Sequence, residues 1–413
     1  MKIQNIIFWV FIFSFLDATE LKIATYNVEN LFDMRYNGTE YQEYIPYKHN
    51  WTKKNLNIKL TNISEVICDI NADIIGLQEI ENSNALKLLQ KSLKRYGCNY
   101  KYSAITHKPR SAIQIALLSK IPIQSKKDIV VTKLWGIRDI LEVKFIIDDN
   151  RPLYIFVNHW NSKKSLDKKR ISSALALKKR ILGLPRDSEY IILGDFNLNY
   201  NEYSVNYILK SMISKDKMTR ECDINKNSFF HYNLWLEKPI YQRWSHNFYG
   251  NKQTLDSILI PYSLLDGRGI DYIDNSFDVL KKSYLFHSKG YILRWEYKKS
   301  RHKGVGYSDH LPIFARFSTS IPYIKSNCSI VIGTIKDLYK NSIKLPLLLK
   351  KVKVISKSKN IVVIKQNQNS ISIYGIDKEL DLGKEYDIIV YKRKFYKNSY
   401  EIVDFEINKR YIE

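Results

Sequence analysis

Ile-Ile-Leu-Gly-Asp-Phe-Asn, residues 191–197, is a buried apolar run that ends directly in polar residues. Side chains of a β-strand alternate between its two faces, so Asp195 and Asn197 share one face and Phe196 lies on the other. A carboxylate and a carboxamide side by side can hold one phosphate group and the water that attacks it. An aspartate that caps a turn is the plain alternative, but the length of this pattern favours a functional strand tip.

Five further polar tips follow apolar runs elsewhere in the chain: Tyr26–Asn30, Gln78–Glu79, Asn158–His159, Leu255–Asp256 and Ser308–His310. Such side chains at the end of a strand suit a cleft better than a core. Six of them in one chain therefore predict an enzyme. We expect one pocket to gather Glu79, His159, Asp195, Asn197, Asp256, Asp309 and His310.

Two of the tips offer ligands for a metal ion. Glu79 and Asp309 carry hard carboxylate oxygens that suit Mg²⁺, Mn²⁺ or Ca²⁺. Asn27 ends the first strand and is expected near the metal, where it orients a ligand or the phosphate. Glu29, two residues on, is the better partner for a salt bridge.

The histidines and their neighbours suit proton transfer. His310 has an ordinary pKa near neutrality and can accept a proton from water. His159 can donate a proton to the leaving oxygen or hold the phosphate, although a satisfied, half-buried histidine is the plain alternative. Asp256 can fix an imidazole tautomer by accepting its N–H. No supporting context surrounds the other histidines, His49, His107, His231, His246, His287 and His302.

Arg138 lies in the stretch Gly136–Glu142, where its guanidinium could clamp a phosphate. The plain alternative is a surface ion pair with Asp139 or Glu142.

Strands alternate with helices in the first 200 residues and then recur in pairs. Helical spacing covers Lys54–Ile70, Asn84–Leu93 and Ser172–Leu182. Short strands are expected at Leu21–Asn27, Asp73–Glu79, Ile113–Ser119, Ile137–Ile147, Leu153–His159, Glu189–Asn197, Thr254–Ile260 and Leu311–Phe317. The pattern predicts an α/β domain with helices outside two sheets. No G-x-G-x-x-G follows a strand, which excludes a dinucleotide-binding fold.

The pattern changes near Ser318–Ser329, and no further polar tip follows. Five strands in about eighty residues predict a small β-barrel or sandwich, for which the oligonucleotide-binding barrel is one candidate. Residues 321–413 hold 18 Lys and Arg against 10 Asp and Glu. Tyr391–Lys397 mixes cations with aromatic residues, as a surface that stacks single strands would, or as a basic hairpin tip would.

The chain of 413 residues carries 66 Lys and Arg against 42 Asp and Glu, a formal net charge of +24. This excess favours a polyanionic partner such as nucleic acid, an anionic membrane or lipopolysaccharide. A generally basic proteome would produce the same excess. The hydrophobic content of 45% excludes a disordered chain.

The N-terminus resembles a secretory signal. Lys2 precedes the apolar run Ile6–Leu16, which is too short to cross a bilayer comfortably, and small or polar residues follow. A buried first strand or an uncleaved anchor would be the alternatives. No later segment reads as transmembrane. Four cysteines permit two disulfides in three pairings, or buried free thiols. They are Cys68, Cys98, Cys222 and Cys328.

Three of the quoted stretches together resemble secreted bacterial nucleases of the endonuclease/exonuclease/phosphatase superfamily. They are Thr25–Phe32, Val157–Lys163 and Gln253–Leu259. The resemblance covers about residues 21–318. It implies a four-layered α/β sandwich of two packed mixed sheets with outer helices, with the site at one edge of the sheets. The expected organisation is a signal peptide at 1–19, a catalytic domain at 20–320 and a small basic all-β domain at 321–413.

The resemblance also implies roles for single residues. Glu79 and Asp309 would bind the metal with Asn27 nearby, and Arg138 would contact phosphate. His159 and His310 would form the histidine pair, while Asp195, Asn197 and Asp256 would hold phosphate and water or orient a histidine. The general base would be Asp195 or the Asp256–His310 pair. Where many relatives have an acidic residue to pair with the first histidine, this chain has Gln114, and Ser257 stands where His or Tyr is common.

These features together predict a secreted, divalent-metal-dependent nuclease that hydrolyses nucleic acid, with DNA favoured over RNA. It would act as a monomer in the periplasm or outside the cell, and by the resemblance its products would carry 5′-phosphates. A sphingomyelinase-type lipid phosphodiesterase is the nearest alternative, with Phe229-Phe230 and Tyr284–Phe286 as candidate membrane-entering loops. A non-catalytic nucleic-acid-binding or adhesion protein and the catalytic subunit of a toxin are the others.

Overall fold

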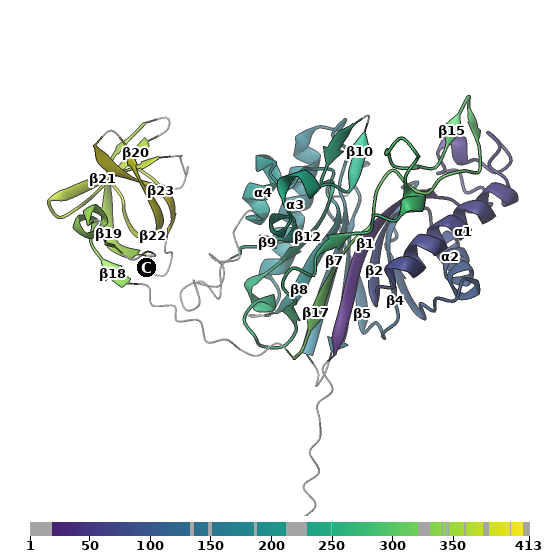
Figure 1. Cartoon of the computed structure of the whole chain (residues 1–413), viewed down its shortest axis with the longest axis horizontal. Helices are drawn as coiled ribbons and strands as arrows, with labels where there is room; N and C mark the ends of the chain where they lie inside the picture. Colours follow the sequence, from purple (N-terminus) through teal and green to yellow (C-terminus); the bar gives the residue numbers. More distant parts are fainter. Residues whose placement is uncertain are drawn as a thin grey trace, which may run out of the picture. The chain divides into compact units, whose positions relative to one another are not determined.

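Two compact units make up the chain (Figure 1). They are described below in a computed structural model that covers residues 19–407 apart from 133–135, 148–150, 186–187, 212–228, 249, 321–330, 341, 344, 346, 359–360, 375–379 and 397. The expected signal peptide therefore lies outside the described residues, except for Thr19. Cys222, Cys328 and Lys397 lie outside them as well.

The first unit contains two large mixed sheets. One sheet has the order β13-β17-β1-β2-β4-β3, with β14 also paired to β17. In its centre β1 runs parallel to β2 and antiparallel to β17. The bounds are β1 Glu20–Leu31, β2 Ile74–Ile80, β3 Tyr102–Ile105, β4 Gln114–Ser119, β13 Asp271–Tyr272, β14 Asp278–Val279 and β17 Ile313–Ser318.

The second sheet has the order β5-β6-β7-β8-β12-β9. Its central strands β7 and β8 are parallel, and β12 lies antiparallel to β8, so that Asp256 pairs with Asp195 across the two strands. The bounds are β5 Ser125–Ile129, β6 Ile140–Ile147, β7 Arg151–His159, β8 Glu189–Asp195, β9 Tyr232–Asn233 and β12 Asp256–Ile260.

The two sheets pack face to face through apolar side chains. A Cβ on Gly76 of β2 would lie 2.6 Å from Leu193 of β8 and 2.8 Å from Val157 of β7, which shows how closely the sheets approach. Helices α1 (Lys53–Ile70) and α2 (Ser83–Arg95) lie on one side, and α3 (Asp167–Leu182) and α4 (Tyr203–Leu209) on the other (Figure 1). The predicted four-layered sandwich is confirmed.

Local sequence explains the helix ends. Thr52 caps α1 by accepting the N–H of Asn55, and Asn71 ends it in the left-handed conformation that asparagine tolerates. The helix α3 begins at Asp167, five residues before the predicted start, because its first turn is polar and lacks the apolar stripe. A disulfide joins Cys68 of α1 to Cys98. No helix among the described residues is both long and apolar enough to span a membrane.

The second unit is all β, as predicted. Strands β19, β20, β21, β23 and β22 pair in that order, and β22 also pairs with β19, which closes a five-stranded barrel. Its own apolar cluster fills the barrel. Their bounds, with the short β18 and the 3₁₀ helix η6, are β18 Val331–Gly333, η6 Ile335–Tyr339, β19 Leu347–Lys357, β20 Ile361–Gln366, β21 Asn369–Tyr374, β22 Glu385–Tyr396 and β23 Ser399–Ile407.

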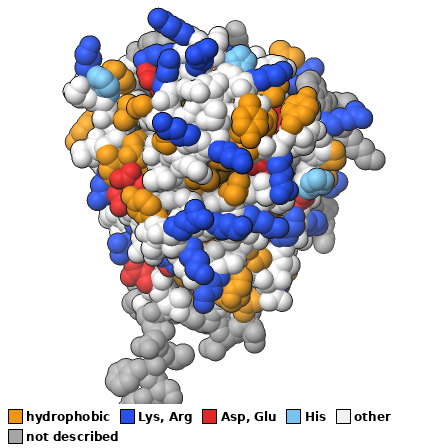
Figure 2. Space-filling model, turned by 90° about the vertical axis from the view of Figure 1, so that its right-hand side faces the viewer, with side chains coloured by type: hydrophobic (Ala, Val, Ile, Leu, Met, Phe, Trp, Pro, Cys, Tyr) orange, Lys and Arg blue, Asp and Glu red, His pale blue; other side chains and the backbone are white. Residues whose placement is uncertain are grey.

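Basic side chains dominate the charged surface of the first unit on the side where α1 and α2 lie. Figure 2 views this side and shows Lys and Arg spread across it, with fewer acidic side chains. This face therefore carries part of the basic excess of the whole chain.

Candidate active site

The predicted polar tips meet at one edge of the two sheets. The amide nitrogen of Asn27 donates to Glu79 Oε1 at 3.2 Å and to Asp195 Oδ2 at 3.0 Å. His159 Nε2 lies 3.7 Å from each of the same two oxygens. Glu79, His159 and Asp195 come from the ends of β2, β7 and β8. Asn27 comes from β1 where its register with β2 shifts, and the strand predicted to end at Asn27 continues to Leu31. The packing of one sheet on the other places the four residues together.

The backbone is irregular at two of the predicted site residues, Glu79 and Asn197. The β2–β4 register shifts between Gln78 and Ile80, and Glu79 between them has a φ of +67°. Asn197 has a φ of +52°. A bulge re-aims a side chain, and a left-handed conformation outside glycine costs about 1–3 kcal/mol that the surrounding structure must offset. Such strain is concentrated at functional sites.

Asp195 and Asn197 form one hydrogen-bonded unit, but not as two residues on one strand face: β8 ends at Asp195, and Asp195 caps the turn that follows, as the alternative interpretation had it. The N–H of Asn197 donates to Asp195 Oδ1 at 2.8 Å, and its amide nitrogen donates to the carbonyl oxygen of Trp160 at 3.0 Å. Burial raises the pKa of Asp195 to about 7, against the opposing effect of His310. Asp195 can therefore exchange a proton near neutral pH.

Asp256 and His310 form a buried dyad. His310 Nδ1 lies 2.8 Å from Asp256 Oδ2, which also accepts the hydroxyl of Ser245 at 2.6 Å. Burial alone would lower the pKa of His310, but Asp256 and Asp195 outweigh it and hold that pKa well above its ordinary value. Its Nε2 faces Asp195 Oδ2 at 3.9 Å. His310 thus carries its proton at neutral pH, which favours Asp195 over His310 as the general base.

His159 has the opposite electrostatic environment. Burial, and then the charges of Arg138 and His310, hold its pKa well below the ordinary value. Its Nδ1 is buried and has no hydrogen-bond partner among the described residues. The side-chain amide of Gln114 bonds to the loop at 106–111 and not to His159. His159 is therefore a neutral imidazole that can donate a hydrogen bond to a phosphate oxygen.

Glu79 and Asp309, the predicted metal ligands, lie in one electrostatic environment. Burial raises the pKa of Glu79, and the negative charge of Asp309 raises it further. The described groups of acids and histidines close enough to hold one ion are His246, Asp309 and His310, and Asp195, Asp256 and His310. Carboxylate oxygens suit a hard cation, so Asp309 fits one most directly, and Glu79 is not part of either group. Asn27 fits less directly as a ligand, because its Oδ1 already accepts the N–H of Glu29 at 3.0 Å, while its nitrogen holds Glu79.

Comparison with known proteins shows the family of this chain. The model of the endonuclease/exonuclease/phosphatase family matches residues 22–319. The chain belongs to this family. The comparison with curated proteins found no match.

Several solved structures are similar to this family member. D. rerio TDP2, solved in complex with a single-stranded DNA product, has 15% identity and a TM-score of 0.48, covering 72% of this chain and 99% of that one. Truncated Caenorhabditis elegans TDP2 has 14% identity and a TM-score of 0.46, covering 72% and 97%. A family protein from Bacteroides thetaiotaomicron has 14% identity and a TM-score of 0.46, covering 74% and 96%.

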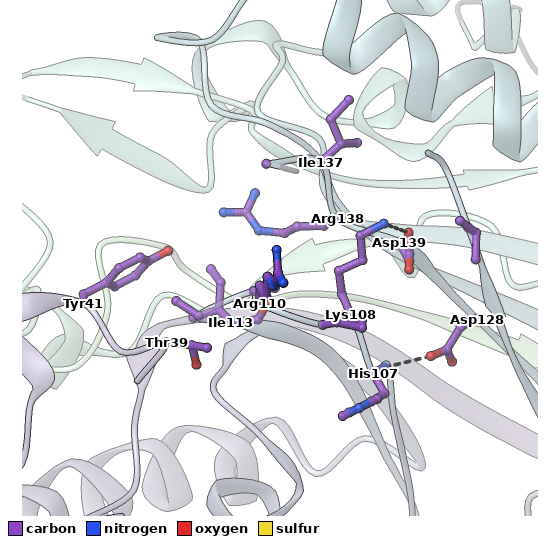
Figure 3. Close-up of a pocket in the computed structure, with 15 residues that line it drawn as sticks. Thr39, Tyr41, His107, Lys108, Arg110, Ile113, Asp128, Ile137, Arg138 and Asp139 are labelled. Carbon is purple, nitrogen blue, oxygen red and sulfur yellow. Dashed lines mark hydrogen bonds and ion pairs between the residues drawn. The ribbon is translucent and has the colours of Figure 1, made fainter. Parts of the chain in front are cut away.

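Arg138, the predicted phosphate contact, lies beside the other predicted site residues. Its Nη1 donates to the carbonyl oxygen of Trp160 at 3.4 Å, the same oxygen that Asn197 uses. Asp139 and Glu142 were the alternative ion-pair partners of Arg138. Each pairs with another residue: Asp139 with Lys108 at 2.8 Å, and Glu142 with Arg180 at 2.6 Å. Arg138 instead lines a cavity beside the site (Figure 3).

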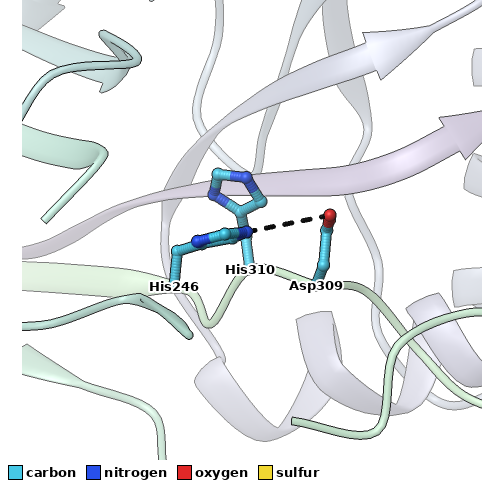
Figure 4. A group of neighbouring side chains, drawn as sticks. All are labelled: His246, Asp309 and His310. Atoms are coloured by element: carbon cyan, nitrogen blue, oxygen red, sulfur yellow. Dashed lines mark ion pairs between the residues drawn. The ribbon is translucent and has the colours of Figure 1, made fainter. Parts of the chain in front are cut away.

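His246 is a site residue that sequence reasoning missed. Its Nε2 lies 3.9 Å from Asp309 Oδ2, and its ring centroid is 4.9 Å from that of His310 (Figure 4). Burial, helped by the charge of His310, lowers its pKa to about 4, so it is neutral near pH 7. His246 begins the hairpin of β10 (His246–Phe248) and β11 (Asn251–Gln253), and no apolar run ends there to signal it.

Arg294 was also missed. Its Nε donates to Glu29 Oε1 at 3.0 Å, and its Nη2 lies 3.5 Å from Asp309 Oδ2. Glu29 is thus the salt-bridge partner expected from the sequence, and Arg294 links it to a predicted metal ligand. A lone arginine within an irregular segment carries no sequence signal of this kind.

Proposed function

We propose that this family member is a secreted, divalent-metal-dependent phosphodiesterase that cleaves nucleic acid, with DNA as the favoured substrate. The observation that carries the proposal is the meeting of Asp195, Asn197, His159 and the Asp256–His310 dyad, with the carboxylates of Glu79 and Asp309 nearby. A buried set of proton-exchanging groups next to a cation site suits hydrolysis of a phosphodiester.

Each side chain has a role in the proposed reaction. Asp195 accepts a proton from the attacking water, which Asn197 helps to orient. Neutral His159 donates its Nε2–H to a phosphate oxygen, and the imidazolium of His310, held by Asp256, stabilises the negative charge that develops there. A divalent ion bound by Glu79 and Asp309 would neutralise charge on the phosphate and the leaving oxygen.

The charge of the molecule supports a polyanionic substrate. The net charge of +24 and the basic surface in Figure 2 would favour nucleic acid through release of its counterions. The two aromatic segments considered for membrane entry do not favour the lipid alternative. Phe229 and Phe286 pack against buried clusters, and the Tyr284 hydroxyl donates to Asp69 at 2.9 Å.

Two features support secretion. The stretch Lys2–Leu16 has the charge and length of a signal segment. The bridge between Cys68 and Cys98 suits an oxidising compartment.

Plasmid cleavage by the purified protein tests the proposal. With Mg²⁺ or Mn²⁺ the wild type should nick plasmid DNA, and EDTA should abolish the activity. His159→Ala and Asp195→Ala should each lower the rate by about 10²–10⁴-fold, the usual contribution of proton transfer and transition-state hydrogen bonds. His287→Ala and Asp278→Ala, which change the same residue types away from the site, should cleave like the wild type.

Equal cleavage by the wild type and both site variants would reject this assignment. Hydrolysis of sphingomyelin in liposomes without cleavage of plasmid, single-stranded DNA or RNA would favour the lipid phosphodiesterase. Binding of DNA without metal and without turnover would favour a non-catalytic protein.

A further inference from the structure

Three side chains with metal-ligating atoms meet at the edge of the candidate active site. His246, Asp309 and His310 each offer one such atom, and these atoms lie within 4.8 Å of one another (Figure 4). The sequence predicted Asp309 as a metal ligand and His310 as a proton acceptor, and it gave His246 no role. His246 is therefore an unassigned nitrogen donor beside a predicted carboxylate ligand.

The backbone holds His246 in this position. His246 forms an antiparallel bridge with His310, and the N–H of Leu311 donates to the carbonyl oxygen of Ser245 at 2.7 Å. These contacts fix the hairpin of β10 and β11 against the segment that carries Asp309. Because they join backbone groups, replacing the His246 ring should leave the hairpin in place.

The segment that carries Asp309 is also held firmly. The hydroxyl of Ser308 donates to the carbonyl oxygen of Asn27 at 2.7 Å and accepts the N–H of His310 at 3.1 Å. Asp309 thus lies between two anchored residues. Ligands that are fixed before the ion arrives bind it without a large cost of ordering.

The distance between the two donors fits one ion. His246 Nε2 lies 3.9 Å from Asp309 Oδ2. An ion about 2.1 Å from each of two ligand atoms separates those atoms by about 3–4 Å. The side chain of Asp309 is 26% exposed, so the ion would keep a face open to water or phosphate.

Arg294 leaves Asp309 available to a cation. The guanidinium of Arg294 makes its hydrogen bonds to Glu29, through both Nε and Nη2. Its Nη2 lies 3.5 Å from Asp309 Oδ2, which is longer than an ordinary hydrogen bond. The arginine balances the charge of this carboxylate without occupying its oxygen.

His310 is engaged elsewhere, although it belongs to the same group. Its Nδ1 lies 2.8 Å from Asp256 Oδ2, and its Nε2 faces Asp195 Oδ2 at 3.9 Å. Both ring nitrogens therefore face carboxylates of the catalytic group. His246 is the histidine whose Nε2 faces Asp309, as the dashed line in Figure 4 marks.

A nitrogen donor changes which ion a site prefers. Mg²⁺ and Ca²⁺ take oxygen ligands, whereas imidazole suits transition metals such as Zn²⁺. One imidazole beside a carboxylate raises the affinity for a transition metal and adds little for Mg²⁺. The identity of residue 246 therefore bears on the choice of ion.

We propose that His246 Nε2 ligates the divalent ion bound by Asp309, and that this nitrogen makes the site prefer a transition metal ion of the Zn²⁺ or Co²⁺ type over Mg²⁺. This inference rests on the proposed function and narrows the class of ion that it uses. His246 is then a specificity-determining residue for the metal.

Metal binding without substrate tests this inference. The full chain, without a histidine tag and stripped of metal with EDTA, is titrated with Co²⁺ and followed by the visible absorption of the bound ion. Calorimetry measures the affinity for Mg²⁺ on the same samples. The test variants are His246→Phe, which keeps an aromatic ring, and His246→Gln, which offers an oxygen in place of the nitrogen. His287→Ala, which removes a histidine away from the site, is the matched control.

Both His246 variants should bind Co²⁺ at least about tenfold more weakly than the wild type, because loss of even an outer-shell partner of a ligand costs about 10–100-fold. Their affinity for Mg²⁺ should stay within about threefold of the wild type. The variant His287→Ala should match the wild type for both ions. If His246→Phe does not fold, the comparison rests on His246→Gln.

Equal Co²⁺ affinity in the wild type and the His246 variants would overturn the inference. Equal losses of Co²⁺ and Mg²⁺ affinity would also overturn it, because His246 would then only support the fold. Failure of the nuclease proposal is distinguishable: plasmid, single-stranded DNA and RNA would stay uncleaved with every metal while Co²⁺ binding still depended on His246.

Discussion

His310 keeps its proton because two carboxylates face it from opposite sides of one ring. Asp256 accepts from Nδ1 at 2.8 Å, and Asp195 faces Nε2 at 3.9 Å. The same proximity helps to set the pKa of Asp195 at about 7 against the larger effect of burial. Proton transfer at this site is therefore a property of the residue group, and replacing one member changes the others.

Asp256→Asn tests the dyad. Asparagine keeps the shape of the side chain but removes the charge that holds the imidazolium, so the plasmid cleavage rate should fall by about 10²-fold or more. Ser245→Ala is a milder change for comparison and should lower the rate less, because it removes one hydrogen bond to Asp256 and leaves the charge in place. A rate for Asp256→Asn within threefold of the wild type would contradict the assigned role of the dyad.

Glu189 gives a pH-dependent contribution to stability away from the site. Burial raises its pKa to about 7 from 4.5, although the N–H of Ile270 donates to Oε1 at 3.0 Å. The folded chain holds this proton between pH 4.5 and 7 while the unfolded chain loses it. The free energy of unfolding should therefore fall as the pH rises through that window.

Glu189→Gln should remove this dependence, because glutamine fills the same space and carries no charge. Urea unfolding should show wild type and variant alike near pH 4, and the variant more stable by about 1–2 kcal/mol at pH 8, after allowance for solvent screening. A difference that is the same at both pH values would contradict the titration of Glu189.

At the scale of the element, strand β8 determines whether the site forms. It pairs with β7 through residues 153–159 and with β12 through Asp256, so one strand sets the spacing of His159, Asp195 and Asp256. Gly194 makes this spacing possible. It has a φ of +131°, and a Cβ there would lie 2.1 Å from the carbonyl oxygen of Asn158.

Gly194→Ala should push β8 away from β7 and destabilise the chain by more than about 3 kcal/mol, because the clash is with backbone. Gly97→Ala separates the backbone strain from the steric clash, since Gly97 has a φ of +98° but a Cβ there would meet no atom within 4 Å. The Gly97→Ala variant should lose only about 1–2 kcal/mol of stability. Thermal unfolding that ranks the two variants equally would contradict the clash.

At the scale of the whole molecule, two apolar cores are separate. Buried clusters of the first unit draw on residues 21–317, and the barrel cluster draws on residues 335–402. The family match ends at residue 319, before the barrel begins. We propose that the catalytic domain ends near residue 320 and that the barrel is a domain of its own.

A chain ending at residue 320 tests this division. It should fold, unfold in one transition and cleave plasmid within threefold of the full chain at low salt, because the site residues all precede residue 311. Calorimetry of the full chain should show a further transition that the shorter chain lacks. Insolubility of the shorter chain, or loss of its activity, would contradict two independent cores.

The sequence by itself determined the long buried strands, their polar tips and the α/β class, because alternation and apolar runs are local properties; it missed short or polar strands such as β3 and β5, which have no such run. It indicated Glu79, Asp195, Asn197 and Asp309 for the same reason: each lies at or next to the end of an apolar run. Tertiary structure alone decided that His246 and Arg294 approach Asp309, and that Gln114 holds a loop and not His159. Those contacts join segments far apart in the chain, and their distances depend on how the sheets and hairpins pack, which no local pattern encodes.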